Sequence, residues 1–133
     1  MPDLSHLLKH LLLASCCLAM PTLSAQVVIN EIHYEPENKT QAEEFIELHN
    51  AAEEPVDLSG WYFSNGIFFR FPDGTVLSGG GYLVVAEDPV VLARNLSVQN
   101  ALGPWEGRLD NNGETLTLRD ASGSRVDEVD YQA

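Results

Sequence analysis

The sequence predicts an all-β protein, an antiparallel β-sandwich that follows an N-terminal signal peptide. Short runs of β-branched and aromatic residues alternate with turns rich in Gly, Pro, Asn and Asp. Two packed antiparallel sheets are the natural way to bury so many short strands. The first 25 residues show the charged head, apolar run and small-residue exit of a secretory signal. We therefore divide the chain into a signal peptide at residues 1–25 and one sandwich domain at residues 26–133.

The apolar run of this signal extends from Leu11 to Met20 and is followed by small residues. It is shorter than the ~20 apolar residues that span a bilayer, so we expect no membrane insertion of the mature domain. Cleavage is expected between Ala25 and Gln26, with Ser24 as the neighbouring alternative because Leu23 is bulky for its position. The sequence therefore predicts export to the periplasm, the cell surface or the medium.

A second export motif overlaps the first. Leu13-Ala14-Ser15-Cys16 resembles the acylation motif of bacterial lipoproteins, in which the cysteine becomes the lipid-anchored N-terminus. His10 lies so close upstream that the apolar run before Cys16 is short, which favours a chance match and a soluble product. Cys16 and Cys17 are the two cysteines of the chain. The mature domain is therefore expected to contain neither a disulfide nor a Cys-ligated metal.

The charge of the chain limits its partners. The formal net charge is −13, from 20 acidic and 7 basic residues. Such a surface repels phosphate backbones and anionic headgroups, because binding either depends on Lys and Arg. We therefore predict no nucleic-acid partner, whereas cations and basic partners fit the charge.

The expected strands are short and evenly spaced along residues 26–133. They are Val27–Tyr34, Glu44–Asn50, Val56–Leu58, Trp61–Ser64, Ile67–Phe71, Thr75–Leu77, Tyr82–Ala86, Thr115–Arg119 and Arg125–Tyr131. Asn65-Gly66 and Asn112-Gly113 predict two-residue type I′ hairpins, whose central residues both need positive φ. Pro89 is expected to begin one or two helical turns within Asp88–Asn95. A bend is expected at Ser78–Gly81 before the next strand. Leu116 and Leu118 alternate with Thr115 and Thr117, which predicts a strand with one buried and one solvated face.

Two of these strands share a Glu-x-His spacing. If side chains alternate regularly, Val28, Ile32, Ile46 and Leu48 point into the core. The outer face then carries Glu31, His33, Glu47 and His49. Two imidazoles and two carboxylates could ligate zinc if the strands pair in a suitable register. The sequence does not give the register in which the two strands pair, and the register decides whether the four side chains meet. We therefore interpret these four residues as a solvated sheet face and predict no metal or other cofactor.

Several motifs together resemble those of a known family. They are Val28–Ile32, Glu44–Asn50, Val56–Trp61, Phe71–Thr75, Gly81–Val85 and Leu109–Leu118. In order and approximate spacing they resemble the lamin-tail domain, over essentially all of residues 26–133. The resemblance implies an immunoglobulin-like β-sandwich, as in nuclear lamins and in many secreted bacterial proteins. In the bacterial type it implies an accessory module attached to hydrolases or surface proteins.

Catalytic motifs are absent from the sequence. There is no GxSxG elbow, HExxH helix, Walker loop or dinucleotide fingerprint. Asp110–Glu114 lacks the ligand pattern of an EF-hand. Carboxylates are plentiful, so a glycosidase-like pair stays an alternative, but a short sandwich leaves little room for a cleft. We therefore predict no catalytic residues.

The predicted function is that of a non-catalytic binding, adhesion or accessory module, which contacts a protein or a cell-surface ligand. The alternatives are a cation-dependent adhesion or hydrolase-accessory domain whose surface carboxylates hold Ca or Zn, and a small secreted hydrolase. Recognition is expected at the loops Glu35–Ala42 and Asn100–Gly107. Trp105 would be an interface anchor if it is exposed, and part of the core if it packs beneath its loop. The last strand ends close to Ala133, which predicts that the chain is part of a larger surface protein.

Overall fold

The structure is a computed structural model that describes residues 26–36 and 40–133. The predicted signal peptide, Cys16 and Ala25 lie outside these residues.

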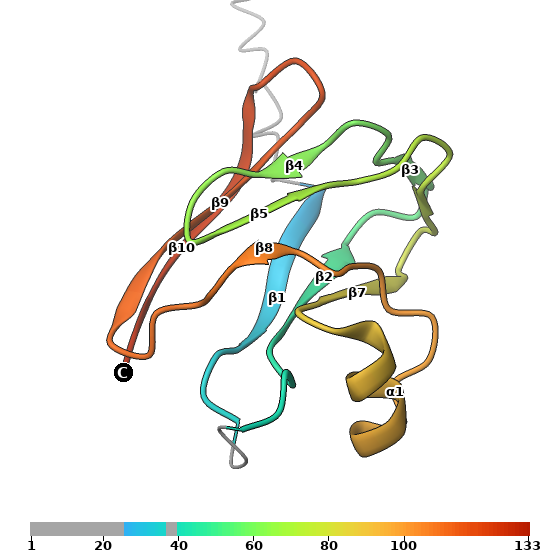
Figure 1. Ribbon diagram of the computed structural model, residues 1–133. Coiled ribbons are helices and arrows are strands. Elements are labelled where there is room, and N and C mark those ends of the chain that lie inside the picture. Colours follow the sequence, from blue (N-terminus) through green and yellow to red (C-terminus); the bar gives the residue numbers. More distant parts are fainter. Residues whose placement is uncertain (1–25, 37–39) are drawn as a thin grey trace, which may run out of the picture.

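Two sheets face each other (Figure 1). The three-stranded sheet has the order β1-β2-β7, from β1 (Val27–His33), β2 (Phe45–Asn50) and β7 (Tyr82–Ala86). The five-stranded sheet has the order β10-β9-β4-β5-β8, from β4 (Tyr62–Phe63), β5 (Ile67–Arg70), β8 (Glu106–Gly107), β9 (Gly113–Arg119) and β10 (Arg125–Gln132). A small third sheet pairs β3 (Val56–Asp57) with β6 (Val76–Leu77).

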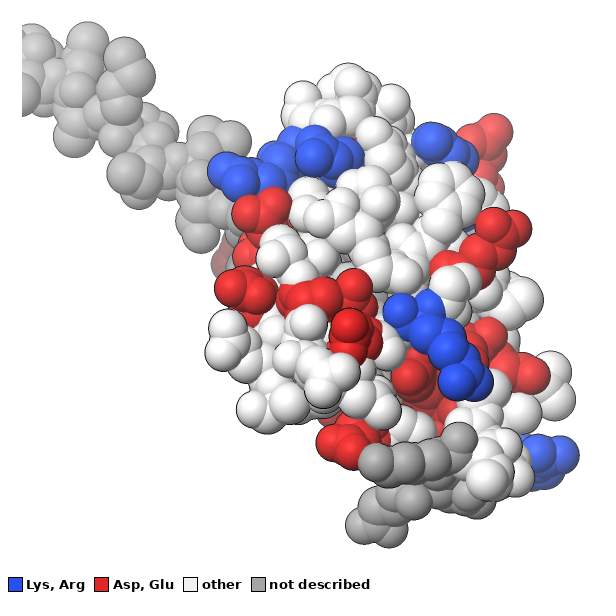
Figure 2. Space-filling view, turned by 60° about the vertical axis from the view of Figure 1, so that its left-hand side comes forward, with Lys and Arg blue, Asp and Glu red and all other residues white. Residues whose placement is uncertain are grey.

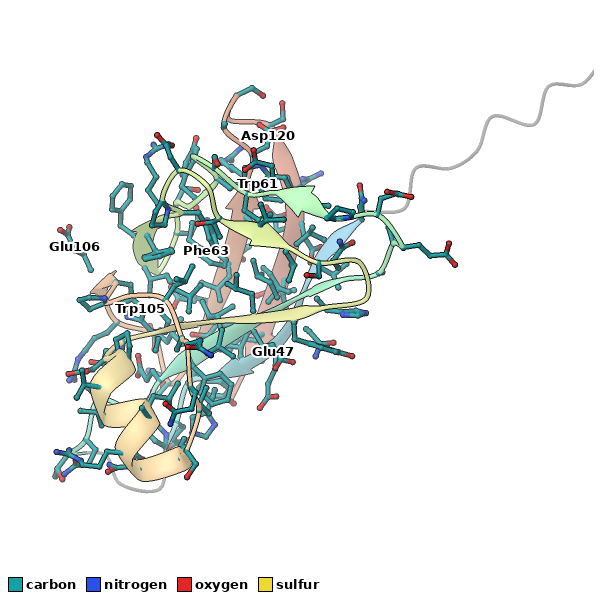
Figure 3. The ribbon with its side chains drawn as sticks, turned by 90° about the vertical axis from the view of Figure 1, so that its right-hand side faces the viewer. Glu47, Trp61, Phe63, Trp105, Glu106 and Asp120 are labelled. Carbon is teal, nitrogen blue, oxygen red and sulfur yellow. The ribbon has the colours of Figure 1, made fainter. Side chains whose placement is uncertain are left out.

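The core lies between the two main sheets. Neighbouring strands in them pair antiparallel, as expected for an immunoglobulin-like sandwich. The largest fully buried apolar side chains are Phe63, Phe71, Ile46, Leu48, Leu58, Leu92, Leu116, Leu118, Val27 and Val85. Figure 3 shows Phe63 between the layers. Because both sheets contribute alternate residues to this core, the all-β antiparallel prediction is confirmed.

Helix α1 (Pro89–Leu96) follows β7 and lies at one end of the sandwich (Figure 1). Asp88 caps it, since its Oδ1 accepts hydrogen bonds from Val90 N (2.9 Å) and Val91 N (3.1 Å). Pro89 occupies the first turn, where its missing N–H costs nothing. The predicted helix is confirmed. No helix in residues 26–36 and 40–133 combines the length and the apolar character that a bilayer crossing needs.

A β-bulge in β1 changes which residues face the core. Ile29 pairs with Leu48 and Glu31 pairs with Glu47, so Asn30 is the additional residue. Before the bulge Val27 and Ile29 are buried, whereas Val28 lies opposite His49 on the outer side. The prediction that Val28 points inward is therefore wrong, because the extra residue reverses the alternation.

The free edge of β1 is held against the other sheet by a side chain. Ile29 N donates a hydrogen bond of 2.7 Å to Oδ2 of Asp127, a residue of β10. Just after β1, Tyr34 Oη donates a hydrogen bond of 3.3 Å to the main-chain oxygen of Gln132, at the end of β10. The first contact gives the N–H of Ile29, on the edge strand β1, a hydrogen-bond partner. Together the two contacts join β1 to β10 and so close this side of the sandwich.

Neither Asn-Gly pair forms the predicted type I′ turn. Gly66 (φ 67°) and Gly113 (φ 98°) have positive φ, but the asparagines before them do not. Ile67 N bonds to Asn65 O (2.7 Å), which is the i to i+2 pattern of a γ-turn. Gly113 N bonds to Asp110 O (3.0 Å), so a β-turn leads into β9 there. The Asn112-Gly113 pair does not join a hairpin, because β8 before it pairs with β5.

The outer face of β9 is drier than its alternating sequence predicts. Leu116 and Leu118 are fully buried as expected, but Thr117 between them is also 1% exposed. Thr117 lies opposite Glu128 of β10, and its Oγ1 donates to Glu128 Oε2 over 3.0 Å. The expectation of a wet face at Thr117 is wrong, because this cross-strand partner covers the hydroxyl.

Candidate functional site

The Glu-x-His residues lie on the outer face of the three-stranded sheet, but pairing separates their histidines. Glu31 lies opposite Glu47, so the two carboxylates come together. His33 lies opposite Phe45, and His49 opposite Val28. His49 therefore lies four residues along β2 from the partner of His33, about 13 Å away along the strand. Figure 3 shows Glu47 pointing away from the core.

Both imidazoles already have aromatic partners. His33 stacks on Phe45 with ring centroids 4.9 Å apart, and His49 stacks on Tyr82 at 4.3 Å. His49 Nδ1 lies 3.0 Å from Gly81 O, so this nitrogen donates and only Nε2 is free to bind a metal. In the part of the chain that the structure describes, no three His, Cys, Asp or Glu residues are grouped to hold a metal ion.

We therefore expect a zinc titration of the domain by calorimetry to show no stoichiometric binding. The physical reason is that the two histidines are too far apart to share one ion with Zn–N distances near 2 Å. The matched sample is the His33→Ala, His49→Ala double variant. Micromolar binding by the parent domain that disappears in this variant would contradict the prediction.

Trp105, the predicted interface anchor, is 6% exposed and belongs to the core. Its loop is attached to β7, where Leu102 N donates to Val84 O and Ala86 N donates to Leu102 O, each over 2.8 Å. Figure 3 places the following residue, Glu106, on the outside. The structure thus realises the alternative in which Trp105 packs beneath its loop, and an exposed hot spot is absent there. This loop also leads into β8, which the sequence analysis missed.

A polar hollow lies where the segment before β2 meets the turn before β9. It has a volume of about 450 Å³ and is lined by Glu44, Arg108, Leu109, Asp110, Asn111 and Asn112. A smaller hollow of about 130 Å³ shares three of these residues and is lined by Pro36, Gln41, Glu44, Glu87, Arg108 and Asn111. The loop predicted at Glu35–Ala42 therefore borders a recess, whereas Asn100–Gly107 does not line it.

Glu44 is the buried acid of this hollow, with only 8% of its surface exposed. Its Oε2 accepts a hydrogen bond from Leu109 N over 3.2 Å, and its main-chain oxygen accepts one from Glu87 N over 3.0 Å. Burial raises the pKa of the Glu44 carboxyl, although the Leu109 N–H opposes the shift. The nearby Glu87 charge raises this pKa further, and Arg108 lowers it.

Arg108 stands at the rim of the hollow. Its Nη2 lies 3.8 Å from Glu87 Oε1, and its side chain is 79% exposed. The Glu87 side chain is only 17% exposed, but a pair at this distance with one exposed partner is weak and easily rearranged. The two hollows together thus present three carboxylates, those of Glu44, Glu87 and Asp110, beside one loosely held guanidinium. Chemically, this arrangement suits the binding of a cationic group with hydrogen-bond donors.

The sequence analysis missed Glu44 as a site residue, although a signal was present. Glu44 and Asn50 share the side of β2 that carries Ile46 and Leu48 into the core. A carboxylate on the apolar side of a strand indicates either a structural hydrogen bond or a functional site. The partner of Glu44 is 65 residues away, so only folding reveals it.

The raised pKa of Glu44 predicts how its substitution depends on pH. A carboxyl whose pKa is raised by folding favours the folded state when protonated, and this contribution is lost as pH rises through the folded pKa. Glu44→Gln stays neutral and keeps an acceptor for Leu109 N. We expect it to raise the free energy of unfolding at pH 7 by less than about 1 kcal/mol, and by a smaller margin at pH 3.5. Urea unfolding at both pH values, with exposed Glu106→Gln as control, measures this. A margin that grows as pH falls would contradict it.

Comparison with known proteins identifies the family of the chain. The family model described as Lamin Tail Domain matches residues 21–133, which include every strand of the structure. Among curated proteins, none matches the sequence. Lamin-tail domains are non-catalytic immunoglobulin-like domains. Since the match spans most of the chain and the two facing sheets agree with it, this protein belongs to the lamin-tail domain family.

Proposed function

We propose that the chain is an exported binding module of the bacterial secreted lamin-tail type, serving in adhesion or beside a hydrolase, without chemistry of its own. The observation that supports this most is the buried Glu44 carboxylate, which opens onto the polar hollow at one end of the sandwich. The loops at the ends of a rigid sandwich are its usual recognition surfaces. The two hollows lie at such an end, lined by Pro36, Gln41 and Glu44 on one side and by residues 108–112 on the other.

The ligand that this hollow suits is a basic side chain of a partner protein. Glu44, which lines both hollows, and Glu87, which lines the smaller one, supply carboxylate oxygens. A guanidinium donates to carboxylates in pairs of parallel hydrogen bonds. A net charge of −13 attracts a basic segment and repels nucleic acid. A partner arginine would compete with Arg108 for Glu87, and the exposure of Arg108 makes that exchange inexpensive.

Catalysis is a weaker interpretation of the same hollow. A hydrolase needs an acid and a base or nucleophile that act on one bond, and each has to be positioned. Glu44 is positioned by Leu109, but Glu87 is paired with the exposed Arg108, over 3.8 Å. The family to which the chain belongs is non-catalytic. These observations favour binding.

The test uses a defined probe, the peptide acetyl-Gly-Arg-Gly-amide, and its neutral citrulline analogue. In a calorimetric or NMR titration we expect the arginine peptide to bind at least about tenfold more tightly than the citrulline peptide. Glu44→Gln removes this preference, and Glu106→Gln, an equal charge change outside the hollow, keeps it. Equal binding of both peptides, or an unchanged preference in Glu44→Gln, would contradict the proposal. Calcium or zinc binding lost in Glu44→Gln would instead support the cation-dependent alternative.

Export is proposed from the N-terminal sequence, with cleavage between Ala25 and Gln26. Mass spectrometry of the mature N-terminus in the native cell tests it. A mature protein that begins at Gln26 supports a soluble module. A mature protein that begins at a diacylated Cys16 would instead show that the module is anchored to a membrane by lipid.

A further inference from the structure

A row of arginines crosses the outer face of the five-stranded sheet, far from the hollow. Arg125 of β10 pairs with Arg119 of β9, Arg119 pairs with Tyr62 of β4, and Tyr62 pairs with Arg70 of β5. The residues next to Tyr62 and Arg119, Phe63 and Leu118, are fully buried, so the row faces outward. A chain with 7 basic and 20 acidic residues thus places three arginines in one line. Figure 2 shows basic side chains near the upper end of one face and both acidic and basic ones over its middle.

Two guanidinium groups of this row are held by neutral partners. Arg70 lies over the Tyr62 ring, with Cζ 4.7 Å from the centroid, and its Nη1 donates to Gly60 O over 2.8 Å. Arg119 donates from Nη1 to Gly123 O over 3.0 Å and from Nε to Ser64 Oγ over 3.3 Å. Within residues 26–36 and 40–133, neither arginine forms an ion pair. Neutral oxygen atoms therefore hold the two guanidinium groups in place, but no carboxylate of the described residues neutralises their positive charges.

These contacts converge on the turn between β9 and β10. A Cβ added at Gly60 would lie 3.3 Å from Ala121 Cβ, and one added at Gly123 would lie 3.4 Å from Tyr62 Oη. The carbonyl that holds Arg70 and the carbonyl that holds Arg119 thus both border this turn, and the Tyr62 hydroxyl lies beside Gly123. In the described residues this hydroxyl has no hydrogen-bond partner, since none of the side-chain bonds of the turn includes it. Two guanidinium groups and one phenol therefore offer donors at one place.

Two acidic side chains beside the row, Glu128 of β10 and Asp120 next to Arg119, have other partners. Glu128 is bound by Arg125 Nη1 (3.1 Å) and by Thr117 Oγ1 (3.0 Å). Asp120 Oδ1 accepts from Ser122 N (2.9 Å) and Ser124 N (3.0 Å) within the turn. Both carboxylates are therefore engaged, and neither neutralises Arg70 or Arg119.

We propose that Arg70, Tyr62 and Arg119 form a binding site for a single carboxylate group on an otherwise uncharged ligand. Guanidinium forks match the planar geometry of a carboxylate, and prior attachment to backbone oxygens reduces the entropy lost on binding. The net charge of −13 repels a polyanion, so one isolated negative group fits better than many. The site is separate from the hollow, because the length of β9 places about 20 Å between them.

The test is a titration followed by NMR of the arginine Nε–H signals and the backbone amides. The probes are sodium benzoate and its neutral isostere benzamide, at constant ionic strength, with benzenesulfonate and phenyl phosphate to compare other oxyanions. We expect benzoate to shift the Arg70 and Arg119 signals and the amides of residues 121–123 along a saturating curve. Benzamide leaves them unchanged, and the Arg94 signal on α1 does not respond.

Variants separate this site from general charge screening. Arg119→Gln and Arg70→Gln are each expected to weaken benzoate binding at least about tenfold, and Arg94→Gln leaves it unchanged. Arg119→Lys, which keeps the charge, and Tyr62→Phe, which keeps the ring, also weaken it while the amide spectrum stays that of the folded domain. Equal responses to benzoate and benzamide would overturn the proposal. An Arg94→Gln effect as large as that of Arg119→Gln would overturn it as well.

Discussion

Replacing Asn50 by alanine is expected to lower the free energy of unfolding by about 3–5 kcal/mol. Asn50 is completely buried at the end of β2. Its Nδ2 lies within hydrogen-bond distance of Glu54 O (2.8 Å), Leu77 O (3.2 Å) and Ser78 O (3.2 Å), and its Oδ1 accepts from Ala52 N (3.0 Å). Alanine would leave these main-chain groups without their partner, and a buried unsatisfied group costs about 1–3 kcal/mol.

Urea unfolding followed by circular dichroism measures this loss. The control is Asn65→Ala at an exposed turn, which is expected to change the free energy of unfolding by about 0.5 kcal/mol or less. Asn50→Asp, which keeps the shape but faces three carbonyl oxygens with a carboxylate, is expected to cost at least as much as alanine. An Asn50→Ala variant with the stability of the parent would show that water replaces the amide, contrary to the prediction.

Gly79→Ala is expected to cost about 2–4 kcal/mol, although Gly79 is exposed. A Cβ at this position would overlap the main-chain oxygen and carbon of Glu53. Because the obstacle is backbone, no side-chain rotation relieves it and the segment has to move. The residue beside it carries a bond that resists such movement, since Gly80 N donates to Ala52 O over 2.9 Å.

The matched control is Gly74→Ala. Gly74 has φ +81° but no atom within 4 Å of its added Cβ, so only the left-handed backbone is penalised, by about 1 kcal/mol. Thermal unfolding of the two variants compares close approach with backbone strain. Equal losses in both, or a larger loss for Gly74→Ala, would contradict the assignment of Gly79 as the point of contact.

Both predictions concern one junction, where residues 51–54 lie between the end of β2 and the turn from β6 to β7. The sequence analysis expected a bend at residues 78–81, and the structure has it. The run of three glycines does not reveal which of them needs its missing side chain. That depends on Glu53, which lies far from Gly79 along the chain but beside it in space.

The strands that the sequence predicted well are those with strong local signals. Ile67–Phe71 and Tyr82–Ala86 combine β-branched or aromatic residues with turn residues on both sides, and β5 and β7 occupy nearly the same positions. In contrast, β8 consists of Glu106 and Gly107, which have little strand propensity. It exists because Ile67 and Phe68 pair with it across the sheet edge. In β8, pairing with the distant strand β5 therefore outweighs the low strand propensity of the residues themselves.

By itself, the sequence determined the all-β class, the helix after Asp88, the sheet-forming segments and the acidic surface, because turn chemistry, period-two patterning and charge are local properties. Only the tertiary structure decided that Val28 faces outward, since a bulge against β2 reverses the alternation. It also placed Trp105 in the core and Glu44 beside Leu109. The row from Arg125 to Arg70 likewise depends on the register of four strands. The physical reason is that register and long-range contacts depend on which strands meet, and a side chain acquires its role only from the neighbours that this pairing supplies.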